Sequence, residues 1–140
     1  MKTDMTRAGV ALALILFGAT GAIAQSCEKT FTAGGEPFLT GIRYRSSGIV
    51  KVTPAKALSN LPRSISAEGF SGIRTDQASG TVTGLKDGAG TGRPQRMQVT
   101  ASKAGSATVI EAVYELQSGQ VADDAQVRAG LCRIIAGAAG

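Results

Sequence analysis

The sequence contains no histidine and no tryptophan, and its aromatic residues are four Phe and two Tyr. Without histidine, the Ser-His and Cys-His pairs that activate many enzyme nucleophiles cannot form. A metal site is not expected either, because two cysteine thiolates would need further ligands. We therefore expect no cofactor and no metal, and a core that rests mainly on Val, Ile, Leu and Ala.

Long apolar runs are also absent, except near the N-terminus. Lys2 and Arg7 precede the uncharged stretch Ala8–Phe17, and Ala22-Ile23-Ala24 then provides an A-x-A cleavage signal. The stretch is short for a membrane span, which needs about 20 predominantly apolar residues. We predict that residues 1–24 are a signal peptide that is cleaved after Ala24.

The remaining residues, 25–140, are expected to form a single periplasmic or secreted domain with no transmembrane span. An exported chain folds in an oxidising compartment, so Cys27 and Cys132 are predicted to form one disulfide. A lipid anchor on Cys27 is the alternative. It is disfavoured because Ala24 stands where bacterial lipoproteins have a large aliphatic residue.

The charge balance is basic, with a formal net charge of +5. In a cytosolic protein this excess would suggest nucleic acid, but in an exported one it fits an anionic envelope surface, and no nucleic-acid partner is expected. Alternating Arg-Tyr-Arg at residues 43–45 is also typical of an exposed strand without a ligand. The candidate binding surface consists of Arg43, Tyr44, Arg45, Arg93 and Arg96.

The first half of the domain is predicted to contain a turn at Gly34–Pro37 and then strands at Thr40–Arg45 and Ile49–Thr53, separated by Ser46-Ser47-Gly48. A helix begins at Thr53-Pro54, since Thr is a good N-cap and Pro suits the first helical position. Gly69 ends it as a left-handed residue. Pro62 is expected to kink or break it.

Alternating apolar residues predict four further strands, and Asp123 is the predicted N-cap of a last helix. The expected fold is α+β: an antiparallel sheet of about four to five strands, covered on one face by two helices in a two-layer sandwich. The four strands are placed at residues 70–76, 81–86, 95–102 and 107–116.

Two short motifs and the acidic residues bear on catalysis. Ser26–Lys29 matches Ser-x-x-Lys, and Gly88–Gly92 has the composition of a phosphate-binding loop, but neither stands in the context that its chemistry needs. Glu111 and Glu115 fall on the polar face of their strand. We predict that the protein is not an enzyme, with a carboxylate-dependent hydrolase as a minor alternative.

The pattern from "VTPAKALSNL" through "AEGFSGIRTDQASGTVTG" to "RAGLCRI" resembles small bacterial envelope domains of helix–sheet–helix form. These include the helix-grip domains of the C component of the β-barrel assembly machine. The resemblance covers about residues 50–137 and implies a non-catalytic adaptor or binding role.

The expected function is therefore that of an exported domain that binds a protein partner or an anionic envelope component. An inhibitor of a secreted hydrolase, acting through the loop at residues 87–94, is the other reading of a small disulfide-linked domain.

Overall fold

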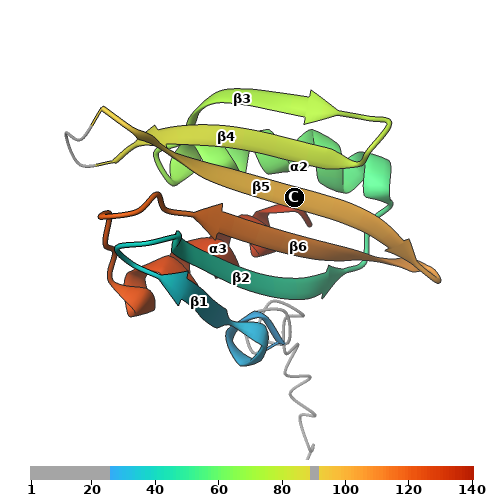
Figure 1. Ribbon diagram of the computed structural model, residues 1–140. Coiled ribbons are helices and arrows are strands. Elements are labelled where there is room, and N and C mark those ends of the chain that lie inside the picture. Colours follow the sequence, from blue (N-terminus) through green and yellow to red (C-terminus); the bar gives the residue numbers. More distant parts are fainter. Residues whose placement is uncertain (1–25, 89–91) are drawn as a thin grey trace, which may run out of the picture.

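The computed structural model describes residues 26–88 and 92–140, which form six strands, two long helices and a short helical segment at residues 26–30 (Figure 1). The predicted signal peptide and the middle of the 87–94 loop lie outside the described residues. The elements, in chain order, are β1 (Thr32–Glu36), β2 (Gly41–Val50), α2 (Pro54–Ala67), β3 (Ser71–Asp76), β4 (Thr81–Asp87), β5 (Pro94–Ala104), β6 (Ala107–Glu115) and α3 (Asp124–Gly137).

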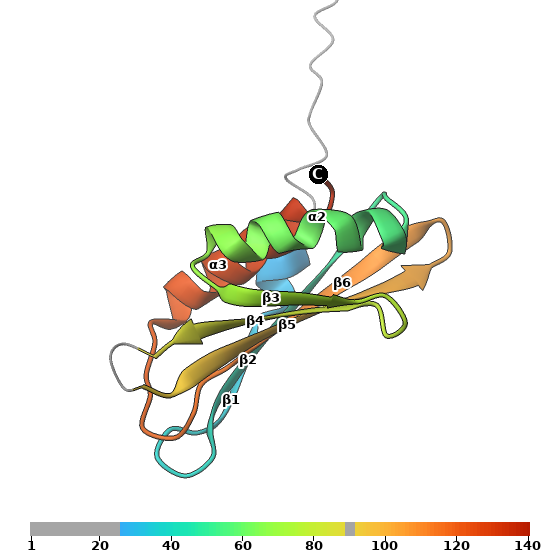
Figure 2. The same ribbon diagram turned by 90° about the horizontal axis from the view of Figure 1, so that it is seen from above.

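All neighbouring strands are antiparallel, in the order β1-β2-β6-β5-β4-β3. Helices α2 and α3 pack side by side against one face of this open, twisted sheet, as Figure 2 shows from the side. The predicted α+β class and the two-layer arrangement are therefore confirmed. No helix within residues 26–88 and 92–140 covers the other face of the sheet.

The predicted number of four to five strands is wrong, because the sheet has six. Thr32–Glu36 was not expected to be a strand, since its Ala-Gly-Gly centre has low β-propensity. It forms strand β1 because β2 offers it a continuous row of backbone partners, from Thr32 opposite Arg45 to Glu36 opposite Gly41. The turn predicted at Gly34–Pro37 accordingly lies further along, after Glu36.

The two strands predicted on either side of Ser46-Ser47-Gly48 are one uninterrupted strand, β2. Ser46 is fully buried, and its hydroxyl donates to the carbonyl oxygen of Cys27 at 3.3 Å. Gly48 pairs with Ile110 in the centre of the sheet. Residues that usually mark a turn are thus used here to bring the N-terminal segment close to the sheet.

The two long helices begin as predicted. The side chain of Thr53 accepts a hydrogen bond from the amide of Lys56, and that of Asp123 accepts from the amide of Gln126. Helix α2 ends at Ala67, and Gly69 follows its C-cap residue Glu68 with a φ of +89°, as a left-handed residue. The break predicted at Pro62 does not occur, since α2 runs through it. Packing of the helix's apolar stripe against the sheet and α3 offsets the one hydrogen bond that proline removes.

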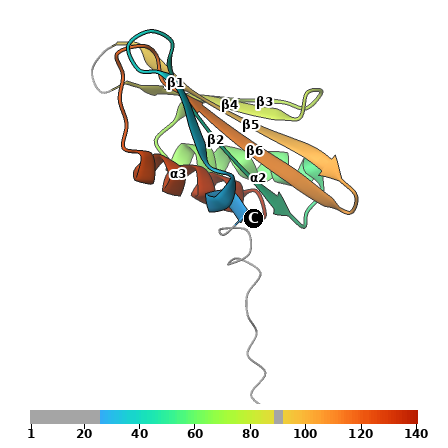
Figure 3. The same cartoon turned by 60° about the horizontal axis from the view of Figure 1, so that its bottom comes forward.

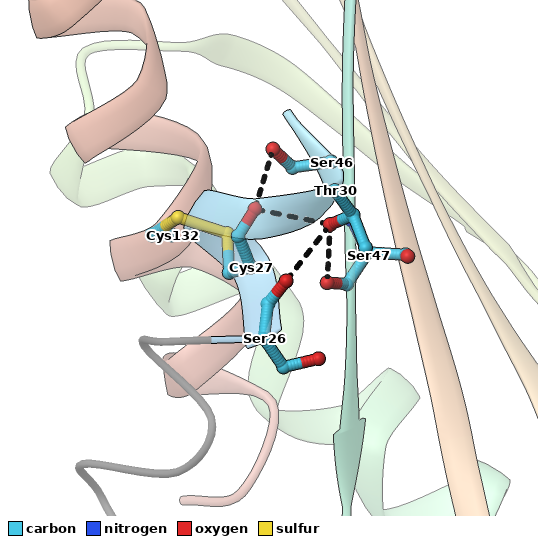
Figure 4. Close-up of a disulfide and its surroundings, with 6 residues drawn as sticks. All are labelled: Ser26, Cys27, Thr30, Ser46, Ser47 and Cys132. Carbon is cyan, nitrogen blue, oxygen red and sulfur yellow. Dashed lines mark hydrogen bonds between the residues drawn. A yellow bond between two sulfur atoms is a disulfide. The ribbon is translucent and has the colours of Figure 1, made fainter. Parts of the chain in front are cut away.

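The predicted disulfide is present, and it joins Cys27 in the short helical segment to Cys132 on α3 (Figure 4). The segment is also held to β2, because the Thr30 hydroxyl accepts from the amide of Ser47 at 2.9 Å. Cys27 is fully buried. The N-terminus of the domain is thereby fixed to its last helix, and this pairing is compatible with an extracytoplasmic protein.

Four aromatic side chains form a row through the core, in the order Phe31, Tyr44, Tyr114 and Phe70. The first two pairs stack, with ring centroids 5.9 and 6.2 Å apart, and Phe70 meets Tyr114 edge-on at 5.5 Å. The scarce aromatics are therefore concentrated between the sheet and the helices, where each buries the most surface.

Candidate functional site

The candidate arginines on the strands come together on the helix-free face of the sheet. Antiparallel register places Gly34, Arg43, Glu115 and Arg96 next to one another in a single row across β1, β2, β6 and β5. Arg45 lies two residues further along β2, and therefore on the same face. All three arginines are exposed.

Tyr44 does not belong to this surface, and its assignment as a binding residue is wrong. Successive side chains of a strand point to opposite faces, so Tyr44 faces the helices and is fully buried. Its hydroxyl donates to Asp124 at the start of α3 at 2.9 Å. Burial, together with this hydrogen bond, raises the pKa of Tyr44 to about 12.

A groove of about 880 Å³ runs along the helix-free face beside the β1–β2 hairpin. The ionisable residues that line it are Arg43, Arg45, Arg96 and Glu115, which leaves an excess of positive charge. Arg43 forms an ion pair with Glu115, whereas Arg96 donates to the side-chain oxygen of Gln98 at 3.0 Å. Gly34 presents no side chain beside Arg43, so the groove stays open at the β1 edge.

Arg93 lies outside the groove, in the segment that leads into β5. Its backbone carbonyl accepts from the amide of Gly88 at 3.3 Å and from the side chain of Gln120 at 2.9 Å. Gln117 donates to the carbonyl of Pro94 at 2.8 Å. These bonds tie the 116–123 loop to the start of β5, so that Arg93 is placed at the same end of the molecule as the groove.

The two acidic residues of the alternative hydrolase reading are both on the helix-free face, as predicted. Glu111 and Glu115 stand opposite Ser47 and Arg43 on β2, four residues apart along β6. At about 3.3 Å per residue, their backbones are roughly 13 Å apart. Carboxyl pairs in glycosidases are about 5–9.5 Å apart, so these two side chains would have to lean toward each other to act as a pair, whereas Glu115 pairs with Arg43.

A smaller cleft of about 280 Å³ lies on the helical side, between β4, β6 and the helices. At its rim Arg133 on α3 forms an ion pair with Glu68 at 2.6 Å, and this raises the pKa of Arg133. Tyr114 lines the cleft and bonds to the side-chain oxygen of Gln95; burial raises its pKa to about 12. Arg133 and Glu68 thus pair with each other, while Lys86 lies over the Phe70 ring and Asp123 caps α3.

In the described ranges, no group of three or more potential metal-binding side chains is found. The same ranges contain no helix that is long and apolar enough to cross a membrane.

Sequence reasoning missed two features of the groove: Glu115 as the ion-pair partner of Arg43, and Leu39 at the rim. The alternation of β6 does place Glu115 on the polar face. The pairing of Glu115 with Arg43 could not be predicted, because the sequence pattern indicates two separate strands where the structure has the single strand β2. Phe38 and Leu39 are an apolar pair next to the Gly34–Pro37 turn, and this pair was the signal that could have pointed to Leu39.

No family model matches the chain, and no curated protein matches it. Among solved structures, it is similar to a conserved protein of unknown function, EF2215 from Enterococcus faecalis. The TM-score is 0.54 at 13% sequence identity, over 86% of this chain and 81% of that chain. This similarity shows a shared fold.

Proposed function

We propose that this protein is an exported, non-enzymatic domain that binds an anionic component of the cell envelope through the groove on the helix-free face of its sheet. Export is supported by the signal-peptide pattern of residues 1–24 and by the disulfide. The absence of histidine and the ion pair that engages Glu115 support a binding role.

The observation that carries this proposal is the meeting of three arginines in one groove. Arg43 and Arg45 come from β2, and Arg96 comes from β5, more than fifty residues later; strand β6 lies between them. Among the described residues, Glu115 is the one carboxylate in the lining. Guanidinium groups bind phosphate and carboxylate groups by paired hydrogen bonds, so the ligand should carry such groups.

The test compares two variants that each lose three positive charges. The first is Arg43→Gln/Arg45→Gln/Arg96→Gln. The second, as the matched control, is Lys51→Gln/Lys56→Gln/Arg63→Gln, which changes exposed residues on and just before α2. Binding of the exported protein to lipopolysaccharide, soluble polyphosphate and phosphatidylglycerol vesicles is measured at low and at physiological salt.

We expect the groove variant to bind at least one of these anions about tenfold or more weakly than the control variant does, since three close charge contacts are lost. Salt should weaken the wild-type interaction, because the Debye length falls from about 30 Å at 0.01 M to about 8 Å at 0.15 M. Equal binding by the two variants to every anion would refute the proposal.

A further inference from the structure

The turn between β1 and β2 exposes two large apolar side chains at its tip. Phe38 and Leu39 are each 80% exposed, the highest values among the large hydrophobic residues of the described ranges. Four other aromatic residues of these ranges are packed in the core row, so Phe38 alone is left in solvent. Adjacent exposed apolar residues at a loop tip usually mark a contact surface.

This tip is ordered by hydrogen bonds before any partner arrives. The amides of Leu39 and Thr40 both donate to the carbonyl of Glu36, at 3.1 and 3.0 Å. The amide of Gly119 donates to the carbonyl of Pro37 at 2.7 Å and so fastens the hairpin to the 116–123 loop. Figures 2 and 3 show the hairpin and this loop side by side at one end of the molecule, where the hairpin projects past the helices.

The neighbouring loop contributes a third exposed apolar side chain, that of Val121, which is 72% exposed. The apolar tip is defined here as Phe38 and Leu39, and Val121 lies in the loop that Gly119 ties to this hairpin. Because the backbone is already held, exposing these side chains to an apolar medium needs little further ordering of the chain.

The arginine groove begins directly behind the apolar tip. Leu39 lines the groove together with Arg43, which lies two residues beyond Gly41, the first residue of β2. Two strand residues span about 7 Å. Apolar side chains of interfacial segments enter the boundary between headgroups and acyl chains by about 5–10 Å. An inserted tip would thus bring Arg43, and Arg96 in the same row, toward the level of the lipid phosphates, with Arg45 about 7 Å further along β2.

We infer that the anionic partner of this groove is a phospholipid bilayer surface, and that the β1–β2 hairpin inserts Phe38 and Leu39 into its interface while Arg43, Arg45 and Arg96 contact the lipid headgroups. This inference rests on the proposed function and names its ligand. Glu36, exposed at the end of β1, opposes the attraction. Glu115 forms an ion pair with Arg43, so the excess positive charge of the groove comes from Arg45 and Arg96, and Arg43 contacts headgroups in competition with Glu115.

The absence of tryptophan provides a direct test. Phe38→Trp gives the exported protein a single tryptophan at the tip. Ile49→Trp is the matched control, since Ile49 is 54% exposed near the other end of the same strand, β2. Each variant is mixed with vesicles of phosphatidylglycerol or of phosphatidylcholine, and the tryptophan emission and its quenching by a lipid-bound quencher are recorded.

We expect a blue shift and quenching at position 38 with phosphatidylglycerol only, and no change at position 49. Adding the three arginine-to-glutamine substitutions should abolish the shift. Phe38→Ser/Leu39→Ser should weaken vesicle binding about tenfold or more and leave the urea unfolding midpoint unchanged, because both side chains are solvent-exposed.

Vesicle binding without a change at position 38 would overturn the insertion of the tip. Binding to polyphosphate or lipopolysaccharide, but to neither kind of vesicle, would also overturn this inference and leave the proposed function standing. Failure to bind any of these anions would overturn both.

Discussion

Removing the disulfide should lower the free energy of unfolding by about 5 kcal/mol. Cys27 and Cys132 are 105 residues apart, so the cross-link closes nearly the whole domain into one loop. For a loop of this length, the chain-entropy model gives about 16 cal/mol/K, or about 4.8 kcal/mol at 25 °C. Single domains are stable by about 5–15 kcal/mol, so this loss is a third or more of the total.

The perturbation is Cys27→Ser/Cys132→Ser, and the assay is urea unfolding followed by far-UV circular dichroism. With an m value of about 2 kcal/mol per M, the midpoint should fall by roughly 2–3 M. Wild-type protein unfolded in the presence of reductant should show a similar decrease. A loss below about 1 kcal/mol in both experiments would show that the cross-link does not constrain the unfolded chain as reasoned.

A control separates the cross-link from the local attachment of the N-terminal segment. Thr30→Ala removes the hydroxyl that bonds to the backbone of Ser47 and leaves the disulfide in place. Its cost should be only about 1 kcal/mol, which is typical of a partly exposed hydrogen bond. If Thr30→Ala costs as much as the double variant, the segment's contacts, and not loop closure, provide the stability.

Two further predictions concern close packing and ionisation. Gly137→Ala should lower the free energy of unfolding, measured in urea, by about 1–3 kcal/mol, because an added Cβ would lie 2.4 Å from the Cβ of Ser64. Gly34→Ala is the control and should be nearly neutral, since no atom lies within 4 Å of the added Cβ. Tyr44 and Tyr114 have pKa values raised from 10.0 to about 12, so the unfolded state loses these protons first. The free energy of unfolding should therefore decrease between pH 10 and pH 12. Tyrosinate absorbance of the native protein should develop near pH 12. A titration of the native protein centred near pH 10 would contradict the burial of both rings.

Much of the fold follows from local signals that act over a few residues. Two helices and two strands were predicted close to their observed bounds. The caps at Thr53 and Asp123 bond to amides three residues away, and the alternating burial of β5 and β6 is visible within each strand, so these signals need no distant partner. The N-terminal part of the sheet could not be predicted in the same way. Strand β1 exists because β2 and the disulfide-linked segment place it at the sheet edge, and this depends on partners distant in sequence.

The same limit applies to the site. The arginines of the sequence suggested a candidate surface, but only strand alternation assigns Arg43 and Arg45 to one face and Tyr44 to the other. Arg96 joins them because β6 aligns Glu115 with both Arg43 and Arg96. A shift of β2 by one residue would exchange the arginines with Tyr44 and place charges in the core. Burial of the Tyr44 ring therefore fixes the register that keeps the arginines in the groove, and one strand alignment determines both the groove and the core.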